Sequence, residues 1–460
     1  MALLTVEDII EATGGELLSK DSKTFSGVSI DSRKISEGEV FFAIKGERFD
    51  GHDFLEKALS GGSGAVVSKK PELIPKGKIV ICVDDTLRSL QNLAHFLRMK
   101  LDIPVVAVTG SNGKTTTKEM IYGILSGKFK TLKNEGNLNN HIGLPLSLTR
   151  LSPDDEVVVL EMGMNAAGEI RRLCEIAGPT HGVITNIGSA HVGRLGSYEA
   201  VRDAKLEILE RLSVAVVNND DEFLMKGIEQ AENFNGEIIT FAINNKSDVM
   251  AKNVRASRKG SDFLLEIRDS GSAPVSLNVS GLFNVYNALA AAAVCVSLGM
   301  GIDDIKAALE AYRGFPMRFE ILRKKGITVI NDSYNANPSS MEKSIKELAR
   351  LGAGGRMVAV LGDMRELDEF SEQEHRALGR IISETGVDVF VAVGEMMGLA
   401  AEESRKAEGG KTPPEVFTFP DVNPAKDNIM DILKEGDTVL VKGSRSMSME
   451  RVIEGITDVI

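Results

Sequence analysis

The chemistry-bearing residues gather first in one stretch, PVVAVTGSNGKTTTKEM, which runs from residue 104 to 120. Its first five residues are apolar and mostly β-branched, which predicts a buried strand, and the residues from Lys114 onward have helical spacing. Between them lies a short loop with two glycines. In a strand–loop–helix of this kind, backbone N–H groups and the helix N-terminus face an anion. Lys114 can then reach terminal phosphates, and the Thr115 hydroxyl can hold Mg²⁺.

The spacing of this loop departs from the general phosphate-loop pattern, in which Gly and four further residues precede Gly-Lys-Ser/Thr. Val108 stands where the first glycine belongs. The sequence therefore predicts a variant phosphate loop rather than that of a GTPase or motor, and the alternative is a plain Gly/Asn turn. The residues predicted to bind ATP here are Thr109, Gly110, Ser111, Asn112, Gly113, Lys114, Thr115 and Thr116.

Three further side chains could act on phosphates. Glu161 ends an apolar run, VVVLE, and His191 follows a strand expected over 182–187. Ligands collect at the carboxyl ends of parallel strands, so both could face the loop and hold a metal. Lys205 lies in a helix expected over 197–212, among apolar residues. The alternatives are a capping Glu, a structural His and an outward-pointing Lys.

Amides and one arginine are candidates for binding polar ligands. The segment 134–141, NEGNLNNH, is either a solvated loop or a ligand-binding one. Asn284 and Asn287 are one helical turn apart and share a face. Arg33, after Asp31 and Ser32, is either an anchor for an anionic ligand or an exposed turn residue.

Composition limits the class of protein. With 460 residues, 43% of them hydrophobic, the chain can form about three domains of ~150 residues. The net charge of −12 argues against nucleic acid as a partner. Three well-separated cysteines give no disulfide frame or zinc site and fit the reduced cytoplasm. The acidic N-terminal residues do not resemble a signal peptide, and the run 288–300 is too short to span a membrane.

The elements that must position these side chains form three α/β units. We expect a small N-terminal unit over 1–102, a central unit with a parallel sheet over 103–312, and a doubly wound unit over 313–460. The central unit includes a β-rich meander at 240–280. In the third unit a strand at 327–330 is followed by a polar loop, NDSYNANP, that starts at Asn331.

Together the motifs resemble the Mur ligase family of ATP-dependent amide-forming enzymes, and the match spans all three units. The segments that carry it are TGSNGKTTT, LEMGMN, TNIGSAH, the Asn284/Asn287 pair, PMRFE and NDSYNANP. Within the family, DSRKISEGEVFFAIKGERFDGHDF, GNLNNHIGLPLSL, LGDMREL and LVKGSRSMSME are most similar to the branch that adds D-alanyl-D-alanine to a UDP-N-acetylmuramoyl-tripeptide. The resemblance implies an N-terminal UDP-binding domain, a central phosphate-loop ATPase domain and a C-terminal Rossmann-like domain.

The resemblance also implies roles. Lys114 would hold phosphates, Thr115 and Glu161 one Mg²⁺, and His191 a second. Lys205 matches a lysine that the family carbamylates, and its carbamate would be an additional metal ligand. Asn284, Asn287, Arg318 and Asp332 would bind ATP, whereas Asp31, Ser32, Arg33, Asn137, Asn139, Asn140, Asn335 and Asn337 would bind substrate. Tyr334 stands where several relatives carry a lysine, which removes one cation.

These residues suit formation of an acyl phosphate from ATP and a carboxylate, followed by attack of an amine. The nucleotide would be shared by the second and third units, so we expect closure about a hinge at 313–316. We expect a cytoplasmic monomer with no partner beyond its small-molecule substrates. Rival interpretations are a folylpolyglutamate synthase, a phosphate-loop kinase or GTPase, and a nucleotide-regulated binding protein.

Overall fold

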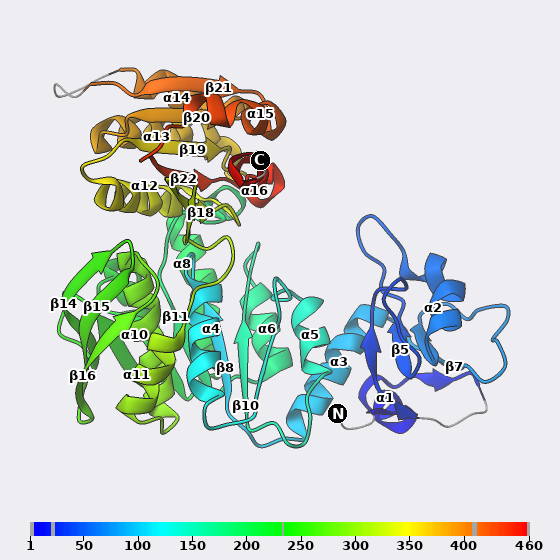
Figure 1. Ribbon diagram of the computed structural model, residues 1–460. Helices are drawn as coiled ribbons and strands as arrows, with labels where there is room; N and C mark the ends of the chain where they lie inside the picture. The colour runs from blue at the N-terminus through cyan, green and yellow to red at the C-terminus, as the bar shows by residue number, and fades with distance from the viewer. Residues whose placement is uncertain (1–3, 20–23, 232–233, 407–411, 458–460) are drawn as a thin grey trace.

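The computed structural model describes residues 4–19, 24–231, 234–406 and 412–457, and it contains three units, each built on its own sheet (Figure 1). The N-terminal unit (blue) lies beside the central one, and the C-terminal unit (yellow to red) lies over the central one. No helix within the described residues is both long enough and apolar enough to cross a membrane. The expected fold class of three α/β domains is confirmed.

The N-terminal unit has a five-stranded sheet in the order β2-β7-β6-β5-β4, in which only the β2–β7 pair is antiparallel. Phe41 and Phe42 enter different hydrophobic clusters because successive strand residues point to opposite faces. The strands are β2 (Glu16–Leu17), β4 (Gly27–Ser29), β5 (Glu39–Phe42), β6 (Gly64–Val67) and β7 (Ile79–Cys82), and β1 (Leu4–Thr5) pairs with β3 (Thr24–Phe25). The helices are α1 (Val6–Thr13), η1 (Gly51–Phe54), α2 (Leu55–Gly61) and α3 (Thr86–Met99).

The central unit has a nine-stranded sheet in the order β16-β15-β14-β13-β12-β11-β8-β10-β9. It is parallel from β9 to β14, and β14, β15 and β16 form the expected antiparallel meander. The strands are β8 (Val105–Thr109), β9 (Thr131–Lys133), β10 (Val157–Glu161), β11 (His181–Ile184), β12 (Val214–Asn218), β13 (Glu237–Ala242), β14 (Val249–Ser257), β15 (Gly260–Ile267) and β16 (Gly271–Leu277).

Helices cover this sheet, and the one after β8 packs its predicted apolar face, including Met120, Ile121, Ile124 and Leu125, into the core with α10. The helices are α4 (Lys114–Leu125), α5 (Gly143–Leu148), α6 (Glu169–Ala177), α7 (Val192–Leu195), α8 (Tyr198–Leu206), η2 (Glu207–Arg211), α9 (Glu222–Glu229), α10 (Leu282–Ser297) and α11 (Ile302–Ala311).

The C-terminal unit has a six-stranded sheet in the order β17-β18-β22-β19-β20-β21, parallel except for β17 at its edge. The strands are β17 (Glu320–Lys324), β18 (Ile327–Asp332), β19 (Met357–Gly362), β20 (Val389–Val393), β21 (Glu415–Phe419) and β22 (Thr438–Lys442). The helices are α12 (Pro338–Gly352), η3 (Asp368–Phe370), α13 (Ser371–Thr385), α14 (Glu395–Ser404), α15 (Val422–Ile432), η4 (Arg445–Met447) and α16 (Glu450–Thr457).

Three predicted element boundaries are wrong. Strand β18 extends to Asp332, because Asn331 and Asp332 pair in register with Val441 and Lys442 of β22, so neither lies in a loop. Strand β11 stops at Ile184, after which the chain turns over the phosphate loop. The helix expected over 197–212 is α-helical only to Leu206 and continues as the 3₁₀ helix η2.

Helix α3 links the first two units along the chain and also packs against both of them. It packs against α1 of its own unit and against α5 and α6 of the central one. Two side-chain contacts fix it there: Gln91 Nε2 donates to the His141 carbonyl, and Arg172 donates to Gln91 Oε1. The N-terminal sheet is therefore held to the side of the central sheet through one helix (Figure 1).

Candidate active site

The loop between β8 and α4 depends on its two glycines. Gly110 has a φ of +140° and Gly113 a φ of +83°, a region that favours glycine. A Cβ atom on Gly110 would lie 2.0 Å from Thr185 Oγ1, and one on Gly113 would lie 2.3 Å from Asn287 Oδ1. The loop is thus pressed against the segment after β11 and against α10, and any side chain there would displace it.

Lys114 and Thr115 occupy the start of α4, as predicted. The Lys114 ammonium folds back and donates to the Gly110 carbonyl at 2.8 Å. Burial is the main cause that lowers the pKa of Lys114, with Arg318 also lowering it and Glu161 opposing the shift. A half-buried cation whose hydrogen bonds within the described residues go to carbonyls is well suited to receive an anion.

Glu161 ends β10 beside the phosphate loop. Its Oε2 accepts a 2.7 Å hydrogen bond from Thr115 Oγ1, and its Oε1 accepts one of 2.7 Å from Asn139 Nδ2. The residue is 4% exposed. Parallel pairing sets this arrangement, because Glu161 is in register with Val108 on β8, immediately before the loop. The three residues thus form one hydrogen-bonded group.

Lys205 does not point outward from its helix; its residue is 1% exposed. Burial lowers its pKa well below the ordinary value, and the nearby charge of Lys114 adds to this. His191 lies close enough for Lys114 and Lys205 to lower its pKa as well, although burial is the larger cause. The structure therefore brings His191 and Lys205 into the surroundings of Lys114.

The C-terminal unit completes this region from the other side. Arg318 Nη2 donates to Thr115 Oγ1 at 3.3 Å, and its guanidinium lies 3.8 Å from the centre of the Tyr334 ring. The Arg318 Nε is buried and has no hydrogen-bond partner within the described residues. Asp332 accepts a 2.6 Å bond from Lys442 Nζ. Arg318 thus presents an unpaired donor beside the phosphate loop.

The remaining candidates divide by location. Asn337 caps α12 and donates to Asn112 Oδ1, joining the polar loop to the phosphate loop at 2.9 Å. Asn284 and Asn287 share a face, as expected, and Asn287 Nδ2 donates to Asn284 Oδ1. Thr109 Oγ1 donates to the Met162 carbonyl and Ser111 Oγ to the Gly188 carbonyl, both distant in sequence. Asn140 Oδ1 accepts from the Gly143 N–H, and Asn335 Oδ1 accepts from the Ala336 N–H. Thr116 is buried in α4, and Asn137 accepts from the Asn139 N–H.

Asp31, Ser32 and Arg33 lie in the N-terminal unit, and within the described residues none of their hydrogen bonds or ion pairs reaches the phosphate loop. Arg33 forms a bidentate pair with Asp31 at 2.8 Å, and its side chain is exposed. The hydrogen bonds from Arg33 are the main cause that lowers the pKa of Asp31. Within the described residues, Arg33 is therefore an exposed side chain paired with Asp31.

The donor set around Glu161 fits a magnesium ion bound together with a nucleotide. Within the described residues, no group of three or more His, Cys, Asp or Glu side chains could hold a metal alone. Mg²⁺ is usually bound by one or two protein oxygens, phosphates and water, and a carboxylate next to a threonine hydroxyl supplies such oxygens. The buried Nδ1 of His191 lies 3.2 Å from Glu366 Oε2 without the alignment of a hydrogen bond, and it is a further candidate ligand atom.

Sequence reasoning missed three residues at this site. Glu366 lies 3.2 Å from His191, Lys442 pairs with Asp332, and Asn134 bonds the backbone of Glu161. Lys442 lies in the quoted LVKGSRSMSME segment, which has no local signal of a partner 110 residues away. Glu366 lies in the quoted LGDMREL segment, which has no local signal of a distant partner.

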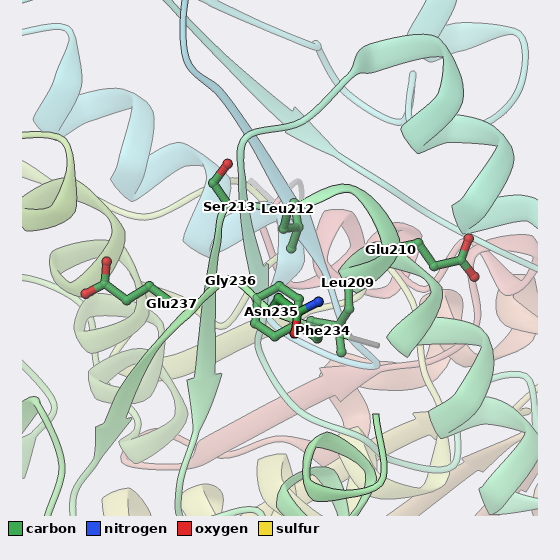
Figure 2. A pocket seen from close by; sticks show the side chains of 8 residues that line it. All are labelled: Leu209, Glu210, Leu212, Ser213, Phe234, Asn235, Gly236 and Glu237. Carbon is green, nitrogen blue, oxygen red and sulfur yellow. The ribbon is translucent and has the colours of Figure 1, made fainter. Parts of the chain in front are cut away.

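Two cavities lie away from the group formed by Lys114, Thr115 and Glu161. One of about 490 Å³ is lined by Ser213, Glu237 and six neighbours (Figure 2). Ser213 precedes β12 and Glu237 begins β13, so this cavity is at the amino ends of the strands, opposite the phosphate loop. The second, about 410 Å³, is bounded by His141, Gly163 and Arg172, between the amide-rich loop and α6.

Three family models match the chain in order. They are described as "Mur ligase family, catalytic domain" over 24–98, "Mur ligase middle domain" over 108–295, and "Mur ligase, glutamate ligase domain" over 317–445. A Bacillus subtilis protein called UDP-N-acetylmuramoyl-tripeptide--D-alanyl-D-alanine ligase is 35% identical, over 99% of this chain and 98% of its own length. The Escherichia coli protein of that name is also 35% identical, over 100% and 99%.

Solved structures agree with these matches. A crystal structure of MurF from Acinetobacter baumannii has a TM-score of 0.90 at 33% identity and covers 100% of this chain and 99% of its own. The Thermotoga maritima MurF ligase in complex with ADP has a TM-score of 0.81 at 30% identity, covering 94% and 96%. A Mycobacterium tuberculosis folylpolyglutamate synthase, at 15% identity and a TM-score of 0.61, shares the fold.

Proposed function

This chain belongs to the Mur ligase family, and we propose that it joins D-alanyl-D-alanine to UDP-N-acetylmuramoyl-tripeptide with hydrolysis of ATP, in peptidoglycan precursor synthesis. The observation that carries this function is the full-length similarity to proteins of that name. The phosphate loop, with Glu161 and Arg318 around Thr115, supports the use of ATP. The ADP complex of a relative supports it too.

The reaction needs activation because a carboxylate is a poor acylating agent. Transfer of the terminal phosphoryl group of ATP to the tripeptide carboxylate gives an acyl phosphate and ADP. The amino group of D-alanyl-D-alanine then attacks the acyl carbon, phosphate leaves, and the amine loses a proton. Both partners in the first step are anions, so catalysis is mainly positioning and charge stabilisation.

We assign the charge stabilisation to residues at the carboxyl edge of the central sheet. Lys114 exchanges its carbonyl partners for phosphate oxygens, and Arg318 adds a second cation from the C-terminal unit. Thr115 and Glu161 would hold one Mg²⁺ and His191 a second. When bound, these ions supply Lewis-acid stabilisation of the phosphoryl oxygens.

Lys205 is proposed to act as a carbamate. Its burial favours the neutral amine, which can add CO₂ to give an N-carboxylate and release one proton. The product is an anion beside Lys114, in place of a second cation. This would relieve the repulsion between the two lysines and provide an additional oxygen ligand for metal.

The remaining assignments follow the three units, with limits proposed at 1–102, 103–312 and 313–460. ATP would be bound by Asn284, Asn287, Arg318 and Asp332 in addition to loop residues 109–116. Substrate would be bound by Asp31, Ser32 and Arg33 at the UDP end, and by Asn137, Asn139, Asn140, Asn335 and Asn337 nearer the reacting groups. We propose a monomer that works in the cytoplasm, closing about residues 313–316.

The decisive test measures phosphate release from ATP with each substrate omitted in turn. Release that requires both UDP-N-acetylmuramoyl-tripeptide and D-alanyl-D-alanine supports the ligase. Release with neither would instead indicate a motor or a nucleotide-regulated binding protein. Running the assay with the lysine-containing and the diaminopimelate-containing tripeptide identifies the third residue, and folylpoly-γ-glutamate substrates serve as the negative control.

A further inference from the structure

Asn134 makes an unusual contact with the backbone of Glu161. Its Oδ1 accepts from the Glu161 N–H at 2.9 Å, and its Nδ2 donates to the Glu161 carbonyl at 2.9 Å. The same Nδ2 donates to the Leu138 carbonyl at 2.8 Å. Asn134 is 1% exposed. Both main-chain polar groups of Glu161 are therefore bonded by a single side-chain amide.

The Asn134 side chain continues the hydrogen bonding along β10 beyond the point where its pairing with β9 ends. Strand β9 pairs with β10 only as far as Lys133, which is opposite Val159. From Asn134 the backbone turns away into the amide-rich loop, and the side-chain amide takes the place of a peptide group. The last residue of β10 thus keeps a hydrogen-bonded edge, although its neighbouring strand has stopped two residues short.

Lys118 fixes Asn134 in turn. Its side chain is fully buried, and its Nζ donates to the Asn134 carbonyl at 2.7 Å and lies 2.9 Å from Glu119 Oε1. Lys118 is one helical turn beyond Lys114 on α4. Because Thr115 Oγ1 also bonds Glu161 Oε2, the contacts form a closed ring from α4 through Asn134 and Glu161 and back to α4.

We propose that Asn134 is a positioning residue, which holds the Glu161 carboxylate at the distance from the phosphate loop that a nucleotide-bound metal requires. Lys118 supports it by fixing the Asn134 backbone. A metal site tolerates a displacement of only about 0.5 Å, and partners outside the ligands set that precision. The inference rests on the proposed function in one respect, the role of Glu161 as a metal ligand.

The test compares metal binding with nucleotide binding. Asn134→Asp keeps the size and the acceptor but loses both donated bonds, and Asn134→Ala loses all three. Mn²⁺ is titrated into protein saturated with ADP and followed by electron paramagnetic resonance. We expect both variants to lower the affinity for Mn²⁺ about 10- to 100-fold. The affinity for ADP, measured in EDTA, should stay within about two-fold of that of the parent. Unchanged Mn²⁺ affinity with a lower melting temperature would show a purely structural role and overturn the proposal.

Controls separate this inference from the proposed function. Asn428→Ala removes another amide bonded to a carbonyl, that of Pro424 on α15 of the C-terminal unit, and should leave Mn²⁺ affinity unchanged. If Asn134→Ala does not fold, Asn134→Asp and Lys118→Met supply the comparison, the latter with a smaller loss. Glu161→Gln should weaken Mn²⁺ at least as much. If it does not, the proposal fails with its premise, whereas the substrate-omission assay still decides the ligase function.

Discussion

His191 Nδ1 lies 3.2 Å from Glu366 Oε2, although His191 follows a strand of the central sheet and Glu366 a strand of the C-terminal one. Both residues have positive φ angles, +66° and +65°, which residues other than glycine rarely adopt. The side-chain contact with His191 is the main cause that lowers the pKa of Glu366, and Arg194 contributes to the shift. The two units therefore meet directly at a proposed metal ligand.

Close packing at this contact predicts the effect of a single methyl group. A Cβ on Gly193 would lie 2.5 Å from the carbonyl carbon of Leu367. Gly193→Ala should separate α7 from the 366–368 turn, and we expect kcat to fall about 10-fold or more because misplacement of about 1 Å is costly. Gly398→Ala, on helix α14 of the C-terminal unit, where no other atom lies within 4 Å of the added Cβ, is the control. Equal kcat values for the two variants would contradict the prediction.

Removing the phosphate-loop cation should abolish turnover with little effect on the fold. We expect Lys114→Met to lower kcat at least 100-fold, the usual effect of losing one group that stabilises transition-state charge. Its melting temperature should stay near that of the parent, since within the described residues the ammonium donates only to carbonyls of the loop. Lys128→Met, at an exposed site just beyond the same helix, should retain activity. Steady-state phosphate release measures both.

The carbamate at Lys205 can be tested by chemical rescue. Lys205→Ala should reduce kcat about 100-fold or more, and acetate or formate should restore part of it by supplying the missing carboxylate. The exposed Lys226→Ala should be fully active and indifferent to these anions. Full activity of Lys205→Ala without any added carboxylate would disprove the role.

Buried histidines predict a loss of stability in mild acid. Burial lowers the pKa of His375, whose Nε2 accepts from the Met364 N–H at 3.0 Å. Below the unfolded value of about 6.5 the unfolded chain binds more protons, so stability falls as the pH drops toward the lower folded pKa. Between pH 7.5 and pH 5.5 the free energy of unfolding, measured in urea, should fall less for His375→Gln than for the parent. The difference between the two decreases should be up to about 1.4 kcal/mol. His141→Gln, at an exposed site, should show the same decrease in the free energy of unfolding as the parent.

Local signals were enough to predict much of the site. The strand, glycine loop and helix around Lys114 are contiguous in sequence, so hydrophobic spacing and two glycines specify them. Glu161 could be placed at a strand end for the same reason. Its match in register with Val108, and hence its bond to Thr115, follows from the rule that parallel strands end at one edge.

Other features depended on distant partners. Asp332 looked like a loop residue because its neighbours are polar, yet pairing with Lys442, 110 residues away, makes it part of β18. For Lys205 the residues alone left an outward-pointing lysine as an alternative to the carbamate that the resemblance implies, and only the tertiary packing shows that it is buried. The partnership of Glu366 with His191 likewise arises from the docking of two separate units.

The sequence by itself determined the three-unit organisation, the phosphate-binding loop and the family, since these depend on short-range spacing and on motifs in order. The tertiary structure alone decided which charges lose water, which meet across units, and how Asn134 completes the strand edge at Glu161. The physical reason is that burial and hydrogen-bond partnership are properties of pairs far apart in the chain, and no local pattern encodes them.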